Sequence, residues 1–152
     1  MELRIRGIAP TDAEREAVES VLGRPPAPSD HERRGGHALR SRRHLLLPTL
    51  HAVNDRVGWI SQPAIDHIAE RLDVSPAEIF GVATFYGLFS TTERVGRQVH
   101  VCVDLACRAA GGARDADLPA GTHASPCLGL CEQAPAALVV EPGGPVRRST
   151  VA

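Results

Sequence analysis

Four cysteines carry most of the chemistry that this sequence offers. They are the only cysteines among its 152 residues, and they form a C-x4-C pair and a C-x3-C pair: Cys102, Cys107, Cys127 and Cys131. Thiolates bind iron and zinc, form disulfides, and act as redox nucleophiles. The pattern therefore predicts a metal centre or a redox centre in the last third of the chain.

The spacing favours a [2Fe–2S] cluster over three alternatives. Such a cluster takes two sulfur ligands on each of two irons, and four cysteines from two loops can supply them. A structural zinc site with four cysteines is the main rival, although zinc sites more often use C-x2-C loops. A dithiol redox centre would need a C-x-x-C motif, which is absent. Two disulfides would suit a secreted protein better.

Composition and termini indicate a protein of a reducing compartment. The net charge is −1, so no attraction to polyanions or membranes is implied. The first residues contain no apolar segment of signal-peptide length, and no apolar run approaches the roughly 20 residues that cross a bilayer. We therefore expect a cytoplasmic protein whose cysteines are kept as thiols.

His100 and His123 lie close to cysteines in sequence, but four sulfurs complete a cluster, so we expect both histidines at the surface.

The first 92 residues have the periodicity of helices. Thr11 and Glu14 form a predicted capping box, Pro48 either kinks its helix or marks a later start, and Ser75 with Glu78 forms a second predicted capping box. Prolines and glycines over residues 23–36 predict a linker. The expected helices cover residues 12–22, 38–57, 61–74 and 75–89.

The remaining residues predict a small α/β unit. The stretch "QVHVCVDL" alternates, with Val99, Val101 and Val103 on one face, which is typical of a β-strand. "AALVVE" and "VRRSTVA" predict two further strands, a short helix is expected over 107–113, and residues 114–126 are expected to form a loop. The fold class is therefore α+β, with a helical bundle before a sheet. The expected domains are 1–36 (helix and linker), 37–92 (helical subdomain) and 93–152 (cysteine-bearing domain).

Two longer stretches resemble a known family. "HVCVDLAC" followed by "SPCLGLCEQAPA" resembles the thioredoxin-like [2Fe–2S] ferredoxins, and more closely the NuoE-type subunit of respiratory complex I. The same subunit type occurs in NAD-dependent formate dehydrogenases, as the gamma subunit, and in bidirectional hydrogenases. The helical stretch from "LLLPTLHAV" to "FYGLF" resembles the same family. The resemblance covers about residues 38–140.

The resemblance implies a redox subunit without activity of its own. One [2Fe–2S] cluster would be held by Cys102, Cys107, Cys127 and Cys131. Single electrons would pass between it and FMN on a NuoF-type flavoprotein subunit, which would also bind NAD(H). This chain contains neither G-x-G-x-x-G after a strand nor a P-loop, which agrees with a nucleotide site elsewhere. Only 19 residues separate Cys107 from Cys127, whereas the respiratory members of the family usually have a longer segment there. The thioredoxin-like layer is therefore expected to be reduced or completed by a partner, and a formate dehydrogenase type of complex is favoured. The alternative function is a non-redox adaptor with a structural zinc site.

Two surface features have alternative interpretations. Four of the five aromatic residues lie in or just after the last predicted helix: Phe80, Phe85, Tyr86 and Phe89. They either fill the helical core or dock on a partner subunit. Five arginines within residues 33–43 either line a solvated linker or dock on an acidic partner surface. RNA binding is poorly supported, because no aromatic residues are interleaved with these arginines.

Overall fold

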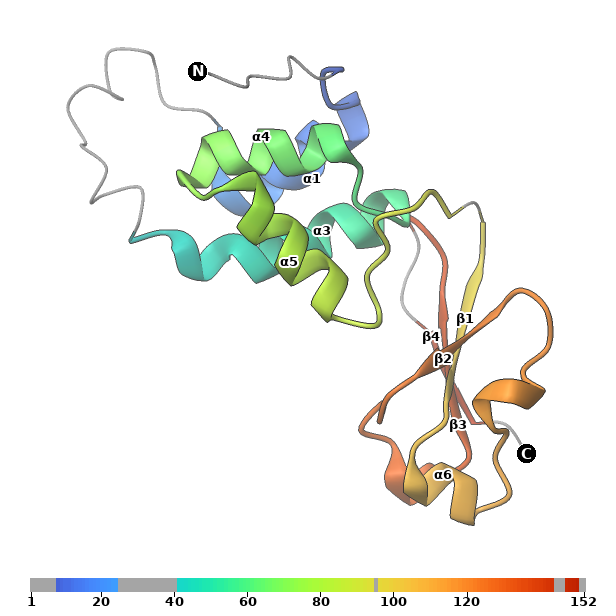
Figure 1. The fold of residues 1–152 in the computed structure, drawn as a ribbon. Helices are drawn as coiled ribbons and strands as arrows, with labels where there is room; N and C mark the ends of the chain where they lie inside the picture. Colours follow the sequence, from blue (N-terminus) through green and yellow to red (C-terminus); the bar gives the residue numbers. More distant parts are fainter. Residues whose placement is uncertain (1–7, 25–40, 95, 144–146, 151–152) are drawn as a thin grey trace, which may run out of the picture. The chain divides into compact units, whose positions relative to one another are not determined.

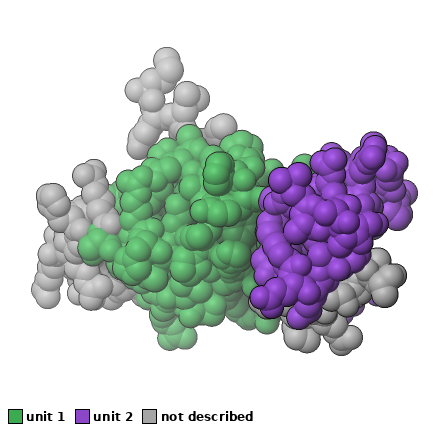
Figure 2. Space-filling view, turned by 90° about the horizontal axis from the view of Figure 1, so that it is seen from below, with its two compact units in different colours: residues 1–93 green, residues 94–152 purple. Residues whose placement is uncertain are grey.

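The structure is a computed structural model that describes residues 8–24, 41–94, 96–143 and 147–150. The chain divides into two compact units, residues 1–93 and residues 94–152, which Figure 2 distinguishes by colour. The described part of the first unit is helical, and that of the second is built on a sheet (Figure 1). The α+β prediction, with helices before the sheet, is therefore confirmed. Among the described residues, no helix is both long and apolar enough to cross a membrane.

Helix α1, Asp12–Leu22, begins with the capping box that the sequence predicts. The Thr11 side chain accepts a hydrogen bond from the Glu14 N–H, and the Glu14 carboxylate accepts one from the Thr11 N–H at 2.7 Å. Two of the N–H groups that a helix start leaves without partners are satisfied in this way.

Helix α3, Leu46–Val57, is shorter than the 38–57 helix predicted. A single 3-10 turn, Arg43–Leu45, precedes it, and residues 38–40 lie outside the described residues. Pro48 lies in its first turn, where the missing proline N–H costs no helical hydrogen bond. Of the two roles predicted for Pro48, the later helix start is therefore confirmed. Gly58 ends the helix with φ 93°, a conformation that glycine adopts without strain.

Two proline-started helices follow. Helix α4, Gln62–Leu72, begins after Ser61, whose hydroxyl accepts a hydrogen bond from the Ala64 N–H at 3.1 Å. The predicted helix over residues 61–74 starts at the same place. Helix α5, Pro76–Phe85, begins after Ser75, but the predicted capping box is wrong because the Ser75 side chain makes no capping hydrogen bond. The Glu78 carboxylate instead pairs with the Arg43 guanidinium, 35 residues earlier.

The apolar faces of the four described helices form one core. Its fully buried residues include Val18, Leu50, Val53, Ile65, Ile68, Leu72 and Ile79. Arginines close the last turn of α1: Arg42 donates to the Leu22 carbonyl at 2.5 Å and Arg71 to the Gly23 carbonyl at 2.6 Å. Cations stabilise a helix C-terminus because its carbonyls are left unpaired. Two of the five arginines in residues 33–43 thus make contacts within the helical unit, Arg42 with the Leu22 carbonyl and Arg43 with Glu78. The other three, residues 33, 34 and 40, lie outside the described residues.

Glu14 joins the starts of two helices, and we predict that its loss destabilises the helical unit. It is 3% exposed. Its carboxylate accepts hydrogen bonds from the Thr11 N–H, from the Thr11 hydroxyl and from the Ser61 hydroxyl, which caps α4. Replacing Glu14 with alanine leaves the buried Ser61 hydroxyl without its acceptor and removes the acceptor of the Thr11 N–H and hydroxyl, so Glu14→Ala should lower the free energy of unfolding by about 2–3 kcal/mol. Glu16→Ala is the matched control on the same helix, since Glu16 makes an exposed ion pair with Arg56 and should cost less than about 1 kcal/mol. Equilibrium urea unfolding compares them, and equal losses would contradict the linking role.

The second unit contains a four-stranded sheet in the order β2-β1-β3-β4. Strands β1 (Gln98–Cys102), β3 (Ala136–Val140) and β4 (Arg147–Thr150) confirm the three predicted strands. Strand β2, Thr122–Ser125, lies within the segment predicted to be a loop and pairs parallel with β1. The pairs β1–β3 and β3–β4 are antiparallel. Helix α6, Leu105–Ala109, begins two residues before the expected 107–113 helix because Asp104 caps it, accepting from the Leu105 N–H at 2.7 Å.

Candidate functional site

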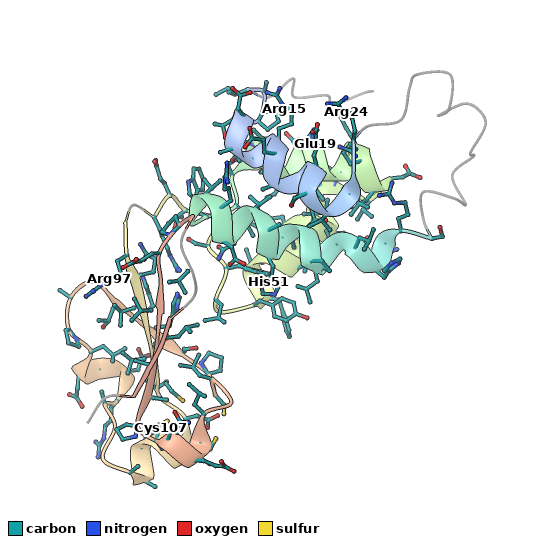
Figure 3. The ribbon with its side chains drawn as sticks, turned by 180° about the vertical axis from the view of Figure 1, so that it is seen from behind. Arg15, Glu19, Arg24, His51, Arg97 and Cys107 are labelled. Carbon is teal, nitrogen blue, oxygen red and sulfur yellow. The ribbon has the colours of Figure 1, made fainter. Side chains whose placement is uncertain are left out.

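The four cysteines lie at one end of the sheet. Cys102 is the last residue of β1, Cys107 lies in α6, Cys127 follows β2 by two residues, and Cys131 begins a 3-10 turn just before β3. Strands β1 and β2 are parallel and β3 is antiparallel to β1, so the ends of β1 and β2 and the start of β3 share one edge. Figure 3 shows Cys107 at this end of the unit, with sulfur atoms nearby.

The thiols are arranged as two pairs. The Sγ atoms of Cys127 and Cys131 are 3.4 Å apart, and both residues are exposed. Cys102 and Cys107 are buried together in one small cluster with Ala136. Half-buried Leu128, Leu130 and Ala134 pack against this buried pair. The site thus has an apolar inner pair and an accessible outer pair.

Burial, hydrogen bonds and neighbouring sulfurs shift the pKa values of Cys102, Cys107 and Cys131. Burial opposes ionisation of Cys102, but hydrogen bonds from the backbone N–H groups of Asp104 and Leu128 and from Cys107 lower its pKa. Burial and the neighbouring Cys102 thiol raise the pKa of Cys107, with a smaller effect from Cys127. The pKa of Cys131 is raised by its hydrogen bond with Cys127 and by the negative charge of the Cys127 thiolate. The charges of Cys107 and Cys102 raise it further. Thiolates this close repel one another, so a cation among them would favour their ionised forms.

Backbone N–H groups around the sulfurs add positive partial charge. Gly129 has φ 72°, and its N–H donates to the Cys127 sulfur at 3.4 Å. A glycine in this conformation brings a backbone donor close to a sulfur that can carry negative charge.

Gly112 holds the Cys107 loop, and we predict that it tolerates no side chain. Its N–H donates to the Cys107 carbonyl at 2.7 Å, and a Cβ added there would lie 2.6 Å from that carbonyl oxygen and 3.2 Å from the Pro135 Cβ. Gly112→Ala must therefore displace the Cys107 backbone and should lower the stability of this unit by about 1–3 kcal/mol. Gly81→Ala is the matched control, since its Cβ would meet no atom within 4 Å and should stabilise helix α5 by about 0.5–1 kcal/mol. Thermal unfolding followed by circular dichroism measures both, and an unchanged midpoint for Gly112→Ala would contradict the prediction.

The two histidines correct the sequence prediction, which placed both at the surface. His100 is 1% exposed, and His123 is half-buried beside it, with ring centroids 5.4 Å apart. The buried face of β1 is the one with Gln98, His100 and Cys102, whereas Val99 and Val101 are half-buried on the other. Burial, together with Arg94 and His123, lowers the pKa of His100 to about 4. Valines signal a strand but do not tell which face is covered, so the burial of His100 could not be seen from the alternation.

Three of the four clustered aromatic residues are exposed on the first unit. Phe85 is 80% exposed, Phe80 46% and Tyr86 43%, and the Phe85 and Tyr86 rings meet edge to face at 5.2 Å. Only Phe89 is buried, where it packs on His51 with centroids 4.7 Å apart. The core interpretation thus holds for Phe89 alone. Phe80, Phe85 and Tyr86 are called the aromatic patch below.

The donor set fits a cluster of two irons. Two sulfur ligands per iron are required, and the thiols form two such pairs among backbone N–H donors. No group of three or more His, Cys, Asp or Glu side chains in the described ranges is arranged to hold a single metal ion. β2, which the sequence prediction missed, carries Ser125 to the same edge, directly beside Cys102. The sequence held no signal for this strand, because Thr122–Ser125 is short and lies between glycine and proline.

The sequence of this chain is similar to those of known proteins. The family model of the thioredoxin-like [2Fe–2S] ferredoxins matches residues 35–117, which is more than half of the chain and includes Cys102 and Cys107. NADH-quinone oxidoreductase subunit 2 of Thermus thermophilus is 34% identical over 70 residues, which span 46% of this chain and 39% of that protein. The E subunit of NADH-quinone oxidoreductase from Aquifex aeolicus is 25% identical over 114 residues, spanning 64% of this chain and 71% of the relative.

A second E subunit, from Rhizobium meliloti, is 30% identical over 111 residues, spanning 62% of this chain and 66% of the relative. The matched segment thus covers about two-fifths of the Thermus protein and about two-thirds of the other two. The family match, the helical segment before a small sheet, and the cysteine pairs at the edge of that sheet all agree. The chain belongs to the thioredoxin-like [2Fe–2S] ferredoxin family, of the NuoE type found in NADH-quinone oxidoreductases.

Proposed function

We propose that this chain is an electron-transfer subunit of an NAD(H)-linked dehydrogenase, and that Cys102, Cys107, Cys127 and Cys131 hold its [2Fe–2S] cluster. The observation that carries the proposal is the meeting of two thiol pairs at one sheet edge in a chain of this family. When bound, the cluster accepts and donates one electron at a time.

The residues around the sulfurs have distinct parts in this proposal. Cys102 and Cys107 would hold the cluster from its buried side, among apolar side chains. Cys127 and Cys131 would hold it from an exposed loop, which gives an electron-transfer partner access. The Gly129 N–H donates to the Cys127 sulfur and would stabilise negative charge on it.

A partner subunit completes the proposed reaction. NADH releases two electrons as a hydride, whereas this centre takes one, so an FMN-bearing NuoF-type subunit is expected between NADH and this chain. Residues 37–92 are proposed as the docking domain and residues 93–152 as the redox domain, both in the cytoplasm, where thiols remain reduced. The short segment between Cys107 and Cys127 favours a formate dehydrogenase type of complex over the respiratory type. In either case the chain is a redox subunit without catalysis of its own.

Reduction of the full chain by NADH tests this function. The anaerobic protein is mixed with NADH alone, and then with NADH and the flavoprotein subunit from the same cells, while its visible absorbance is followed. Bleaching that requires the flavoprotein is expected. Bleaching by NADH alone, or no bleaching with an active flavoprotein that binds the chain, would overturn the proposal.

A further inference from the structure

Ser125 has a buried hydroxyl group without a hydrogen-bond partner. It is the last residue of β2 and is 1% exposed, and its Oγ has no partner within the part of the chain that the structure describes. Buried hydroxyl groups in native proteins nearly always find a partner, so each exception needs an explanation such as an absent acceptor.

The register of the sheet places this hydroxyl at the cysteine edge. Ser125 is the β2 partner of Cys102, and each is the last residue of its strand. The Val103 N–H donates to the Ser125 carbonyl at 3.0 Å, which fixes the two strand ends together. Partnered residues on parallel strands direct their side chains to the same face, so Ser125 and Cys102 are neighbours on one face. Cys127 lies only two residues further along the chain.

Sulfur atoms at this site accept hydrogen bonds, since the Gly129 N–H donates to the Cys127 sulfur at 3.4 Å. Cys102 carries the sulfur beside Ser125. A serine O–H on the neighbouring strand is a further donor of the right kind, and sulfur that carries negative charge is a stronger acceptor than a neutral thiol.

His100 offers the competing acceptor. Its Nδ1 is also buried without a partner among the described residues, and His100 lies two residues before Cys102 on the same strand face. In the register of the sheet, however, the β2 partner of His100 is His123, and the β2 partner of Cys102 is Ser125. The Cys102 sulfur is therefore the acceptor nearer to the Ser125 hydroxyl.

We propose that the Ser125 hydroxyl donates a hydrogen bond to the Cys102 Sγ when the cluster is bound, and that this raises the reduction potential. The inference rests on the ligand set proposed above. Reduction adds negative charge to the centre, and a donor to sulfur stabilises the reduced form more than the oxidised form. Ser125 is thus a positioning and tuning residue that acts through a ligand.

A matched pair of variants isolates the hydroxyl group. Ser125→Thr keeps the hydroxyl group. Ser125→Val lacks the hydroxyl group but has nearly the same size as the threonine variant. Ser125→Ala also lacks the hydroxyl group and adds no volume. A redox titration monitored by EPR should give the valine and alanine variants a lower potential, with about a tenfold shift toward the oxidised form, or about 59 mV for one electron. The threonine variant should stay close to the wild type. Thr122→Val, at the far end of the same strand, should leave the potential unchanged.

Each outcome separates this inference from the proposed function. Iron and sulfide are first measured in the wild type and in every variant. If all of them hold two irons and the threonine and valine variants share one potential, the hydrogen bond to sulfur is overturned while the ligand set stands. If the wild type holds no iron after anaerobic reconstitution, the proposed function and this inference are both overturned. If the alanine variant fails to fold, the threonine and valine pair still decides.

Discussion

Replacing Cys102 by alanine is expected to remove the iron from this protein while its helical unit stays folded. Iron should fall from about two atoms per chain to nearly none, because the buried inner pair would lose one of its two ligands and no other thiol is available to replace it. The four helices have a core of their own, made entirely of residues 17–89, so their circular dichroism should persist. Iron analysis and far-ultraviolet circular dichroism on the same anaerobic sample measure both effects.

A neighbouring substitution serves as the control for Cys102→Ala. Leu105 lies between the two inner cysteines, and its side chain is 75% exposed, so Leu105→Ala should retain the full iron content. Cys127→Ala should lose iron as Cys102→Ala does. Two irons per chain in either cysteine variant would contradict the ligand assignment.

Replacing Phe85 by alanine is expected to weaken binding to the proposed flavoprotein partner. Phe85 is the most exposed member of the aromatic patch, and a phenylalanine left 80% exposed gains the most from burial against another protein. A central aromatic contact contributes about 2 kcal/mol or more to binding, which corresponds to at least about a 30-fold rise in Kd. Isothermal titration calorimetry of the full chain against the flavoprotein measures it.

The effect should be specific to the aromatic patch. Ile8→Ala is the matched control, because Ile8 is equally exposed, at 85%, and lies outside the patch. Its Kd should equal that of the wild type, and both variants should keep the cluster and the unfolding midpoint. If Phe85→Ala binds the flavoprotein as tightly as Ile8→Ala does, the patch is not the docking surface.

The elements that local residues dictate were predictable from the sequence. The start of α1 at Thr11, the start of α4 at Ser61 and the end of α3 at Gly58 each depend on one side chain or one glycine. The exceptions depend on contacts that local residues do not determine. At Ser75 the Glu78 N–H donates to the backbone carbonyl of Ser75, and the Glu78 carboxylate pairs with Arg43. Strand β2 was missed because four residues of weak strand propensity are held by pairing with β1.

For the site, the sequence predicted the cysteines but not their surroundings. Their number and spacing indicate a cluster, yet the division into a buried and an exposed pair depends on which face of β1 is covered. The packing that covers this face also buries His100, and the pairing of β2 with β1 places Ser125 beside Cys102. Alternation along a strand identifies two faces, and only the packed structure tells which one is inside.

The most direct test of the central claim is one anaerobic preparation of the full chain, assayed for iron, acid-labile sulfide and zinc and examined by visible absorption and EPR. Two irons and two sulfides per chain, with a rhombic EPR signal that appears only after reduction, are the expected result. One zinc per chain and no colour, after attempted reconstitution of the cluster, would contradict the electron-transfer function and would favour a structural adaptor.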